Sequence, residues 1–269
     1  MTLLTRRASL AIFAAAAAVW GQDQVATISQ SQWKTFLDWF TALDPNSFHT
    51  GQELFTLYKA KLAKDGVSAA EAEQVLGGIR EKLLADPAGS KLFWNKHYER
   101  DDPQFRTDPN AFLMEVASKL RPGKALDLGM GEGRNSIFLA RLGWDVTGVD
   151  TADVGVAKAR KRAESLGLKI NAIVQDADKF DFGNNRWDLV CLLYAPGANE
   201  VNDFDKRLAG SLKPGGLVVA EWPYITPKFL AELSEDWEKL GLKLKRLEYR
   251  VEKSDWGQPS FGRGLFEKT

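Results

Sequence analysis

Residues 124–135 read KALDLGMGEGRN, and the expected architecture of the chain follows from them. The segment starts as a short apolar strand, passes through glycines at alternate positions, and continues as a helix over residues 136–142. Glycine is needed where a backbone turns sharply against a ligand, because a Cβ atom would be in the way. The segment therefore predicts a strand, a ligand-binding turn and a helix, which is the start of a βαβ unit.

Two residues discriminate between the ligands that such a turn accepts. A dinucleotide-binding turn has Gly or Ala three residues after its second glycine, where this chain has Arg134. Asp127 also lies directly before the turn. A carboxylate there would repel a pyrophosphate at the helix N-terminus but would suit a cationic ligand. S-adenosyl-L-methionine (SAM) carries an ammonium and a sulfonium and no phosphate, so the pattern favours SAM over NAD.

Two more acids follow at the ends of predicted strands. The strand over residues 144–150 ends in Asp150, 23 residues after Asp127, where a carboxylate can accept both ribose hydroxyl protons. The strand over residues 170–174 leads to Asp176, which could accept a hydrogen bond from an adenine amine. The carboxyl ends of parallel strands share one edge of a sheet, so we expect the three acids to converge there.

Strands and helices alternate from residue 121 onward, which predicts an α/β fold with a Rossmann-like, doubly wound, largely parallel sheet. Residues 186–194 form a nearly continuous apolar run, as expected of a central strand. Residues 217–222 are predicted to form the next strand.

Composition excludes several classes of protein and site. The chain has 269 residues, with Lys plus Arg (36) balancing Asp plus Glu (36), so no basic footprint for a nucleic acid is expected. A single cysteine, Cys191, excludes an intramolecular disulfide framework and cysteine-rich zinc sites. Two histidines, His49 and His97, leave little for a histidine metal site, and we predict no metal. A small-molecule substrate is the expectation, while the oligomeric state is left open.

The first 22 residues predict an export signal rather than part of the fold. Arg6 and Arg7 precede an apolar run over residues 10–20, which is too short to span a bilayer as a helix. The arginine pair resembles a twin-arginine signal of bacteria, although Ser9 stands where that signal usually has Phe. We expect an exported or periplasmic protein. The alternative is an uncleaved segment that tethers a cytoplasmic protein to the membrane, its only predicted membrane contact.

Residues 28–89 predict a helical extension. Apolar residues recur at helical spacing from Trp33 to Leu43, and two similar stripes follow before Pro87. A small bundle that packs on the main domain or on a partner is expected, with residues 90–269 forming the main domain.

Five motifs stand in order along the second half of the chain: DLGxGxGRN (127–135), VD (149–150), QDA (175–177), WDLV (187–190) and LKPGG (212–216). In this order they resemble the class I SAM-dependent methyltransferases, within them the small tellurite-resistance and thiopurine methyltransferase-like group. The resemblance covers about residues 90–268. It implies a seven-stranded sheet whose last hairpin is antiparallel, formed by residues 242–251 and 261–267.

The resemblance also implies a set of SAM-binding residues. Aromatic residues of the segment over residues 93–100 would lie over the cofactor, and the glycine turn and the strand ends would hold it. Arg134 and Asn135 have the alternative of capping or pairing locally. The Thr151-Ala152 pair stands where the family usually has Ile-Ser, next to the expected adenine contact. The predicted cofactor residues are Trp94, Tyr98, Asp127, Gly129, Gly131, Gly133, Arg134, Asn135, Asp150, Thr151, Asp176, Ala177 and Leu193.

Methyl transfer from a sulfonium is an in-line displacement, and a thiolate or telluride would need no protein base, whereas an oxygen or nitrogen nucleophile usually does. The candidates for a base are His97 and Tyr194, and Glu221 and Tyr224 are further candidates. The Asn/Asp-Pro-Pro-Tyr signature of amino-group methylation is absent. Two other functions stay open at this point: a SAM-binding sensor without turnover, and a nicotinamide-dependent oxidoreductase.

Overall fold

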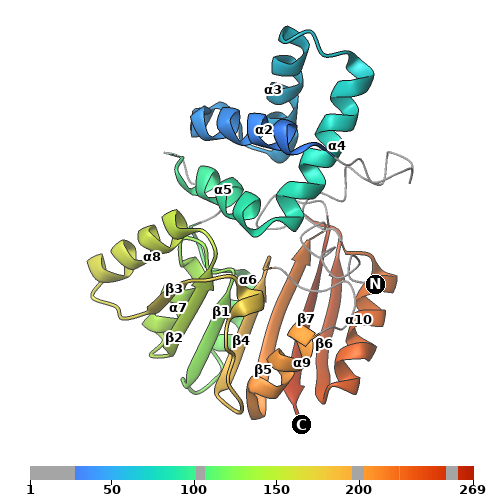
Figure 1. Cartoon of the computed structure of the whole chain (residues 1–269). Coiled ribbons are helices and arrows are strands. Elements are labelled where there is room, and N and C mark those ends of the chain that lie inside the picture. Colours follow the sequence, from blue (N-terminus) through green and yellow to red (C-terminus); the bar gives the residue numbers. More distant parts are fainter. Residues whose placement is uncertain (1–27, 101–106, 196–202, 224, 253–259) are drawn as a thin grey trace. The chain divides into compact units, whose positions relative to one another are not determined.

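The computed structural model describes residues 28–100, 107–195, 203–223, 225–252 and 260–269 (Figure 1). Contacts divide the chain into two compact units, one that ends near residue 104 and one that follows it. The predicted export signal and Tyr224 lie outside the described residues. No described helix is both long and apolar enough to cross a membrane.

The first unit is a helical bundle. Its helices are α2 (Gln30–Ala42), α3 (Gly51–Lys64), α4 (Ala69–Ala85) and α5 (Pro87–Tyr98), with a 3-10 turn η2 (Pro45–Ser47). Side chains cap the helix starts: Ser29 and Gln32 form a capping box on α2, and Ser68 accepts from the backbone of α4. Aromatic rings fill the core, where Phe36 packs edge-on against Tyr58 with centroids 5.0 Å apart. The predicted helical extension is therefore a bundle with its own core.

Helix α5 packs with this bundle. Phe93 is buried in the same core as α2, α3 and α4, and Lys96 donates to the carbonyl oxygen of Leu43 (3.0 Å). The helical unit consequently continues past residue 89, where the sequence indicated its end, because the aromatic face of α5 completes its core.

The second unit contains a seven-stranded sheet in the order β3-β2-β1-β4-β5-β7-β6. The strands are β1 (Lys124–Leu128), β2 (Asp145–Asp150), β3 (Asn171–Val174), β4 (Trp187–Leu193), β5 (Leu212–Pro223), β6 (Leu242–Arg250) and β7 (Phe261–Lys268). Strands β1 to β5 pair in parallel, while β7 runs antiparallel to both β5 and β6. The predicted fold class is confirmed. One boundary differs: β5 begins at Leu212 rather than at residue 217, because Leu212 already pairs with Trp187.

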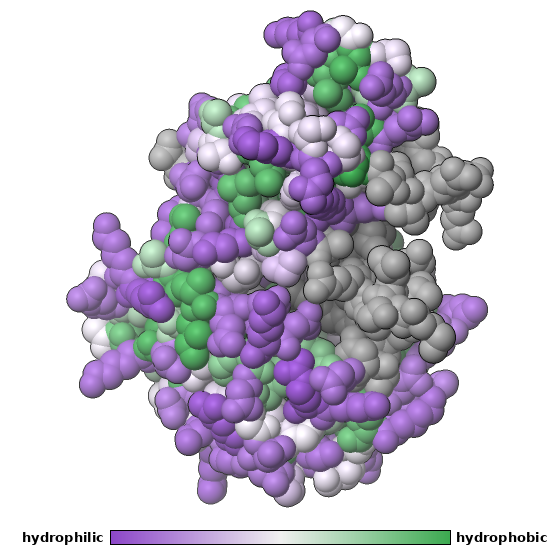
Figure 2. Space-filling model, viewed as in Figure 1, coloured by the Kyte–Doolittle hydropathy of each residue, from purple (hydrophilic) through white to green (hydrophobic). Residues whose placement is uncertain are grey.

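Helices cover both faces of the sheet (Figure 1). One face is covered by α6 (Ala111–Ala117), α7 (Arg134–Arg141) and α8 (Asp153–Ser165), of which α8 packs on β2 and β3. Phe112 of α6 and Leu139 of α7 are buried there in one core cluster with Val146 and Val219 of the sheet. On the other face, α9 (Asp203–Ser211) and α10 (Pro227–Lys239) bury Leu208 against the sheet. Hydrophilic side chains make up most of the visible surface of this unit (Figure 2).

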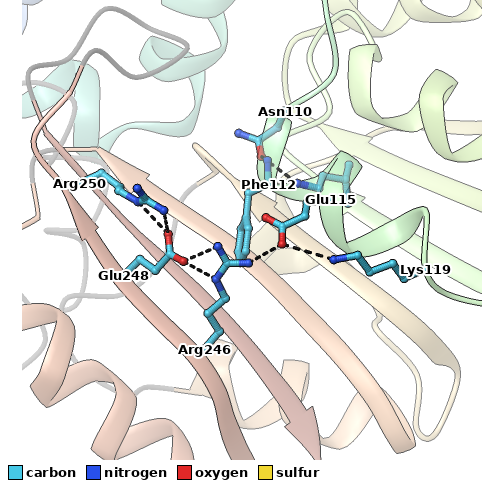
Figure 3. Close-up of polar contacts among 8 residues, drawn as sticks. Asn110, Phe112, Glu115, Lys119, Arg246, Glu248 and Arg250 are labelled. Carbon is cyan, nitrogen blue, oxygen red and sulfur yellow. Dashed lines mark hydrogen bonds and ion pairs between the residues drawn. The ribbon is translucent and has the colours of Figure 1, made fainter.

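A charged cluster joins α6 to the β6 edge of the sheet (Figure 3). Arg246 bonds Glu115 of α6 (2.7 Å) and Glu248 of its own strand, and its guanidinium lies 5.2 Å from the ring centroid of Phe112. Arg250 bonds the second oxygen of Glu248 (2.6 Å). Exposed ion pairs contribute little to the free energy of unfolding. The cation–π contact of Arg246 with Phe112 and its bond from β6 to α6 therefore contribute most of the stabilisation by this cluster.

Replacing this arginine tests the link. We expect Arg246→Ala to lower the free energy of unfolding by about 1 kcal/mol, because it removes the stacked guanidinium and both ion pairs. Arg250→Ala is the matched control, since its ion pair stays within β6, and it should cost less. Urea denaturation of both variants measures the difference; equal losses would contradict the role given to Phe112 and Glu115.

Candidate active site

The glycine turn between β1 and α7 has the backbone that only glycine adopts readily. Gly129, Gly131 and Gly133 have φ angles of 70°, 51° and 77°. The amide of Gly129 donates to the carbonyl oxygen of Val149 on β2 (2.9 Å), which fixes the start of the turn. A Cβ atom on Gly133 would lie 2.8 Å from that of Ala159 on α8, so a side chain there would collide with the neighbouring helix. Turn geometry thus favours glycine at all three positions, and packing against α8 also requires it at Gly133.

Asp150 ends β2 and binds the turn directly. One carboxylate oxygen accepts from the amide of Gly131 (2.8 Å) and the other from the amide of Ala152 (2.8 Å). Burial raises the pKa of this carboxyl, and the backbone donors, Thr151 among them, act in the opposite direction. Sequence reasoning gave Asp150 a role toward a ligand; the structure adds that it also holds the glycine turn against β2.

Asp127 lies at the penultimate position of β1 and is almost completely buried. Its carboxyl accepts a hydrogen bond from the hydroxyl of Ser136 on α7 (2.6 Å). Burial raises its pKa to about 6, and the Ser136 hydrogen bond and the charge of Arg134 only partly offset that effect. Such a carboxyl is costly to ionise, so a cation bound beside it would be favoured.

Arg134 and Asn135, the first residues of α7, contact the segment that leads into α6. Arg134 donates to the carbonyl oxygen of Asp108 (3.1 Å), and the Asn135 side-chain oxygen accepts from the amide of Asn110 (2.9 Å). These are the local contacts that the sequence left open as the alternative to cofactor binding. Their predicted contact with a cofactor stays a prediction.

The remaining predicted residues of this unit stand at neighbouring strand ends. Thr151 follows β2, and Asp176 and Ala177 follow β3, where Asp176 caps the 3-10 turn η3 (Ala177–Lys179) by accepting from Asp178 (3.0 Å). The amide of Gln175 donates to the carbonyl oxygen of Asp150 (2.9 Å) and joins the ends of β2 and β3. Leu193 ends β4 and is buried. The acids thus gather at one edge of the sheet, as the spacing predicted.

Trp94, His97 and Tyr98 belong to the helical unit. The rings of Trp94 and Tyr98 are stacked with centroids 6.2 Å apart. His97 is buried against Phe48, and its Nδ1 bonds the carbonyl oxygen of Phe93 (3.0 Å). Burial lowers the pKa of His97 to about 4, so the imidazole is neutral at pH 7 and packs as a core side chain. The predicted place of Trp94 and Tyr98 over a cofactor stays a prediction.

A second polar group lies at the ends of β4 and β5. Glu221 of β5 is almost completely buried and bonds Tyr194, Asn110 and Arg263. Tyr194 and Glu221 were candidates from the sequence, whereas Asn110 and Arg263 were missed. The available signals were an asparagine immediately before a helical stripe, typical of an N-cap, and an arginine inside an inner strand.

Comparisons with known proteins agree with this geometry. A methyltransferase domain model matches residues 125–216. The ubiquinone biosynthesis O-methyltransferase of Bradyrhizobium diazoefficiens is 30% identical over 208 residues, which are 77% of this chain and 74% of that protein. TehB of Haemophilus influenzae, a probable S-adenosyl-L-methionine-dependent methyltransferase, is 34% identical over 73 residues, 27% of this chain and 26% of that protein.

Three further curated relatives are matched over 41%, 52% and 55% of their length, so the chain spans about half of each of these proteins. A solved structure from work on the conversion of a disulfide bond into a thioacetal group during echinomycin biosynthesis overlaps with a TM-score of 0.50 at 18% identity, over 66% of this chain and 93% of that chain. At this identity the likeness concerns the fold alone. The extent of the match to the Bradyrhizobium protein, on a sheet of this order, shows that the chain belongs to the class I SAM-dependent methyltransferases.

Proposed function

We propose that the protein transfers the methyl group of SAM to a small-molecule acceptor. The observation that carries the proposal is the pair of carboxyls, Asp127 and Asp150, on the two sides of the glycine turn. Asp127 suits the ammonium group of SAM, and Asp150 suits the ribose hydroxyls. The carboxyl of Asp127 would repel a pyrophosphate placed beside it, which favours SAM over NAD.

The acceptor is proposed to be a small molecule for two reasons. The chain carries no excess of positive charge, which a nucleic-acid substrate would favour. The Bradyrhizobium relative, which matches 77% of this chain, is named for ubiquinone biosynthesis, and a relative that matches 41% is named a demethylmenaquinone methyltransferase. Both names refer to quinones, which are not macromolecules.

The chemistry follows from the in-line geometry of the displacement. The nucleophile must approach the methyl carbon opposite the sulfur at about 3–3.5 Å, with water excluded. The strand ends of β1 and β2 hold the donor, and the adjacent ends of β4 and β5 are proposed to hold the acceptor. S-adenosylhomocysteine and the methylated acceptor are the products.

We also propose that the protein is exported, as Arg6, Arg7 and the apolar run over residues 10–20 suggest. A twin-arginine route would carry the domain across a membrane already folded. That route would allow one load of SAM, a cytoplasmic metabolite, to travel inside it.

Removing the proposed ribose ligand tests SAM binding. We expect Asp150→Ala to weaken SAM by about 2–3 kcal/mol, because two ribose donors and the amide of Gly131 lose their acceptor. Calorimetry measures the affinity, and Asp145→Ala, at the exposed opposite end of β2, is the control. Wild-type affinity in the Asp150 variant, or NAD binding as tightly as SAM in the wild type, would contradict the proposal.

Replacing Asp127 by a neutral residue separates two effects of its charge: the destabilisation of the folded protein and the proposed binding of SAM. Its pKa of about 6 exceeds the ordinary value of 3.8, so the folded state holds the proton more tightly and loses stability as the pH rises from about 4 to 6. At pH 7 Asp127→Asn should therefore be more stable than the wild type without ligand, by at most about 3 kcal/mol, and should bind SAM more weakly.

Thermal denaturation between pH 4 and pH 7, with and without SAM, measures both effects. Asp145→Asn serves as the control, because this carboxylate is at the exposed start of β2. An Asp127→Asn protein that binds SAM normally would remove the proposed ammonium site.

The export signal is tested by N-terminal sequencing and cell fractionation. A mature protein that begins near Gln22 is expected, and Arg6-Arg7→Lys-Lys should block export if the twin-arginine route is used. Unchanged export of that variant would point to the ordinary secretory route. A protein that begins at Met1 or Thr2 in the soluble cytoplasmic fraction would refute both cleavage and tethering.

A further inference from the structure

A buried polar cluster occupies the carboxyl end of β4 and β5, beside the proposed donor site. We call it the Glu221 cluster; its members are Asn110, Tyr194, Glu221 and Arg263. Cys191 of β4 pairs with Asp127 of β1, and Tyr194 lies three residues further along the chain. The cluster is therefore at the same edge of the sheet as the proposed SAM-binding acids.

Each oxygen of the Glu221 carboxylate has a defined partner. One oxygen accepts from the Tyr194 hydroxyl and from the side-chain amide of Asn110 (3.1 Å). The other accepts from Nε of Arg263 (2.6 Å), whose guanidinium lies 4.7 Å from the ring centroid of Phe261. Arg263 thus supplies a positive charge beside the buried carboxyl of Glu221, and the Tyr194 hydroxyl donates its hydrogen bond to that carboxyl.

The backbone of Tyr194 is in an unusual conformation. Its φ angle is 60°, in the left-handed region that a bulky residue seldom adopts, and its amide donates to the carbonyl oxygen of Glu221 (3.0 Å). Such strain persists where surrounding contacts impose it, and it concentrates at functional sites. At Tyr194 this strained backbone conformation places the phenol ring so that its hydroxyl bonds Glu221, at the edge of the sheet where the ligand is proposed to bind.

The cluster is also connected to the glycine turn. Asn110 caps α6 with its side-chain oxygen, which accepts from Phe112 (3.0 Å), and its own amide donates to Asn135 (2.9 Å). Asn135 begins α7 next to the turn. A hydrogen-bonded path thus runs from the proposed donor site to Tyr194 and fixes the two relative to each other.

We infer that Tyr194 and Glu221 remove the proton of the acceptor, which is consequently a hydroxyl compound rather than a thiolate or another ionised soft nucleophile. This inference rests on the proposed function. A phenol that donates a hydrogen bond to a carboxylate becomes more polarised, so its oxygen accepts a hydrogen bond more strongly than that of a free phenol. The hydroxyl of an acceptor molecule can donate to this oxygen.

The step balances as follows. The acceptor oxygen forms a bond to the methyl carbon while the bond from that carbon to sulfur breaks, and the sulfonium becomes a neutral thioether. The acceptor proton passes to the Tyr194 oxygen as the phenolic proton passes to Glu221. Tyr194 is thus a catalytic residue, and Glu221 is a positioning residue that acts through it and holds the proton until release.

Two probes of different nucleophilicity test the inference. A phenol has a pKa of about 10, so the hydroxyls of 3,4-dihydroxybenzoate are protonated at pH 7.5. Thiophenol instead offers an ionised sulfur at this pH. We expect Tyr194→Phe and Glu221→Gln to lower kcat for the hydroxyl probe by at least about 100-fold, the usual contribution of general base catalysis. For thiophenol the change should stay within about 3-fold. S-adenosylhomocysteine formation is the readout.

Raising the pH gives a readout that a merely structural role would not move. As the pH approaches about 10 the hydroxyl probe ionises, so the deficit of Tyr194→Phe should shrink. Tyr249→Phe, which removes a hydroxyl from a partly exposed tyrosine of β6, is the matched control and should behave as the wild type. Calorimetry with SAM and a melting curve verify that each variant is folded and loaded.

Other outcomes would overturn the inference. Equal losses for both probes, a deficit that does not change with pH, or a wild type that methylates only thiophenol would each do so. A wild type that binds SAM but methylates neither probe would refute the hydroxyl acceptor and leave SAM binding intact. A folded wild type without SAM binding would refute the proposed function as well.

Discussion

The bond between the Asp150 carboxylate and the amide of Gly131 holds the candidate site together. The glycines of the turn have no side chains that could fix their backbone, although Met130 between them is buried and Glu132 pairs with Lys158 of α8 (3.1 Å). At Gly131 the backbone is held by a neighbouring strand. Asp150 supplies that restraint from β2, and the same carboxylate is proposed to bind a ribose. Under that proposal, ligand binding and local folding would use one carboxylate, which requires the acid to stand at the strand end next to the turn.

A second restraint comes from the other side of the turn. Helix α7 is tied by Arg134 and Asn135 to the segment before α6, and Asn110 continues the connection to Glu221. The sheet supplies the strand ends, while these polar contacts fix the helices over them. Buried polar groups of this kind are expensive unless every member is bonded, which gives the arrangement a single geometry.

The helical unit has a different basis. Its helices are stabilised by stacked aromatic rings and by side-chain caps at their starts, and its buried histidine is neutral. None of these contacts requires a ligand. The unit is consistent with a packing element, and its aromatic residues on α5 are the part that the family resemblance connects with a cofactor.

Local patterns in the sequence were sufficient for the succession of strands and helices, the glycine turn and the acids at the strand ends, because alternation of strands and helices and the positions of glycine are short-range properties. The order of the strands in the sheet was seen only in the structure. The roles of single side chains were not accessible in the same way. Asn110 and Arg263 are separated from Glu221 by 111 and 42 residues, and only the packed sheet brings the three together. The Asp127 pKa of about 6 likewise arises from burial among residues distant in the chain. Periodicity predicts which elements form, but desolvation and long-range hydrogen bonds exist only once those elements pack.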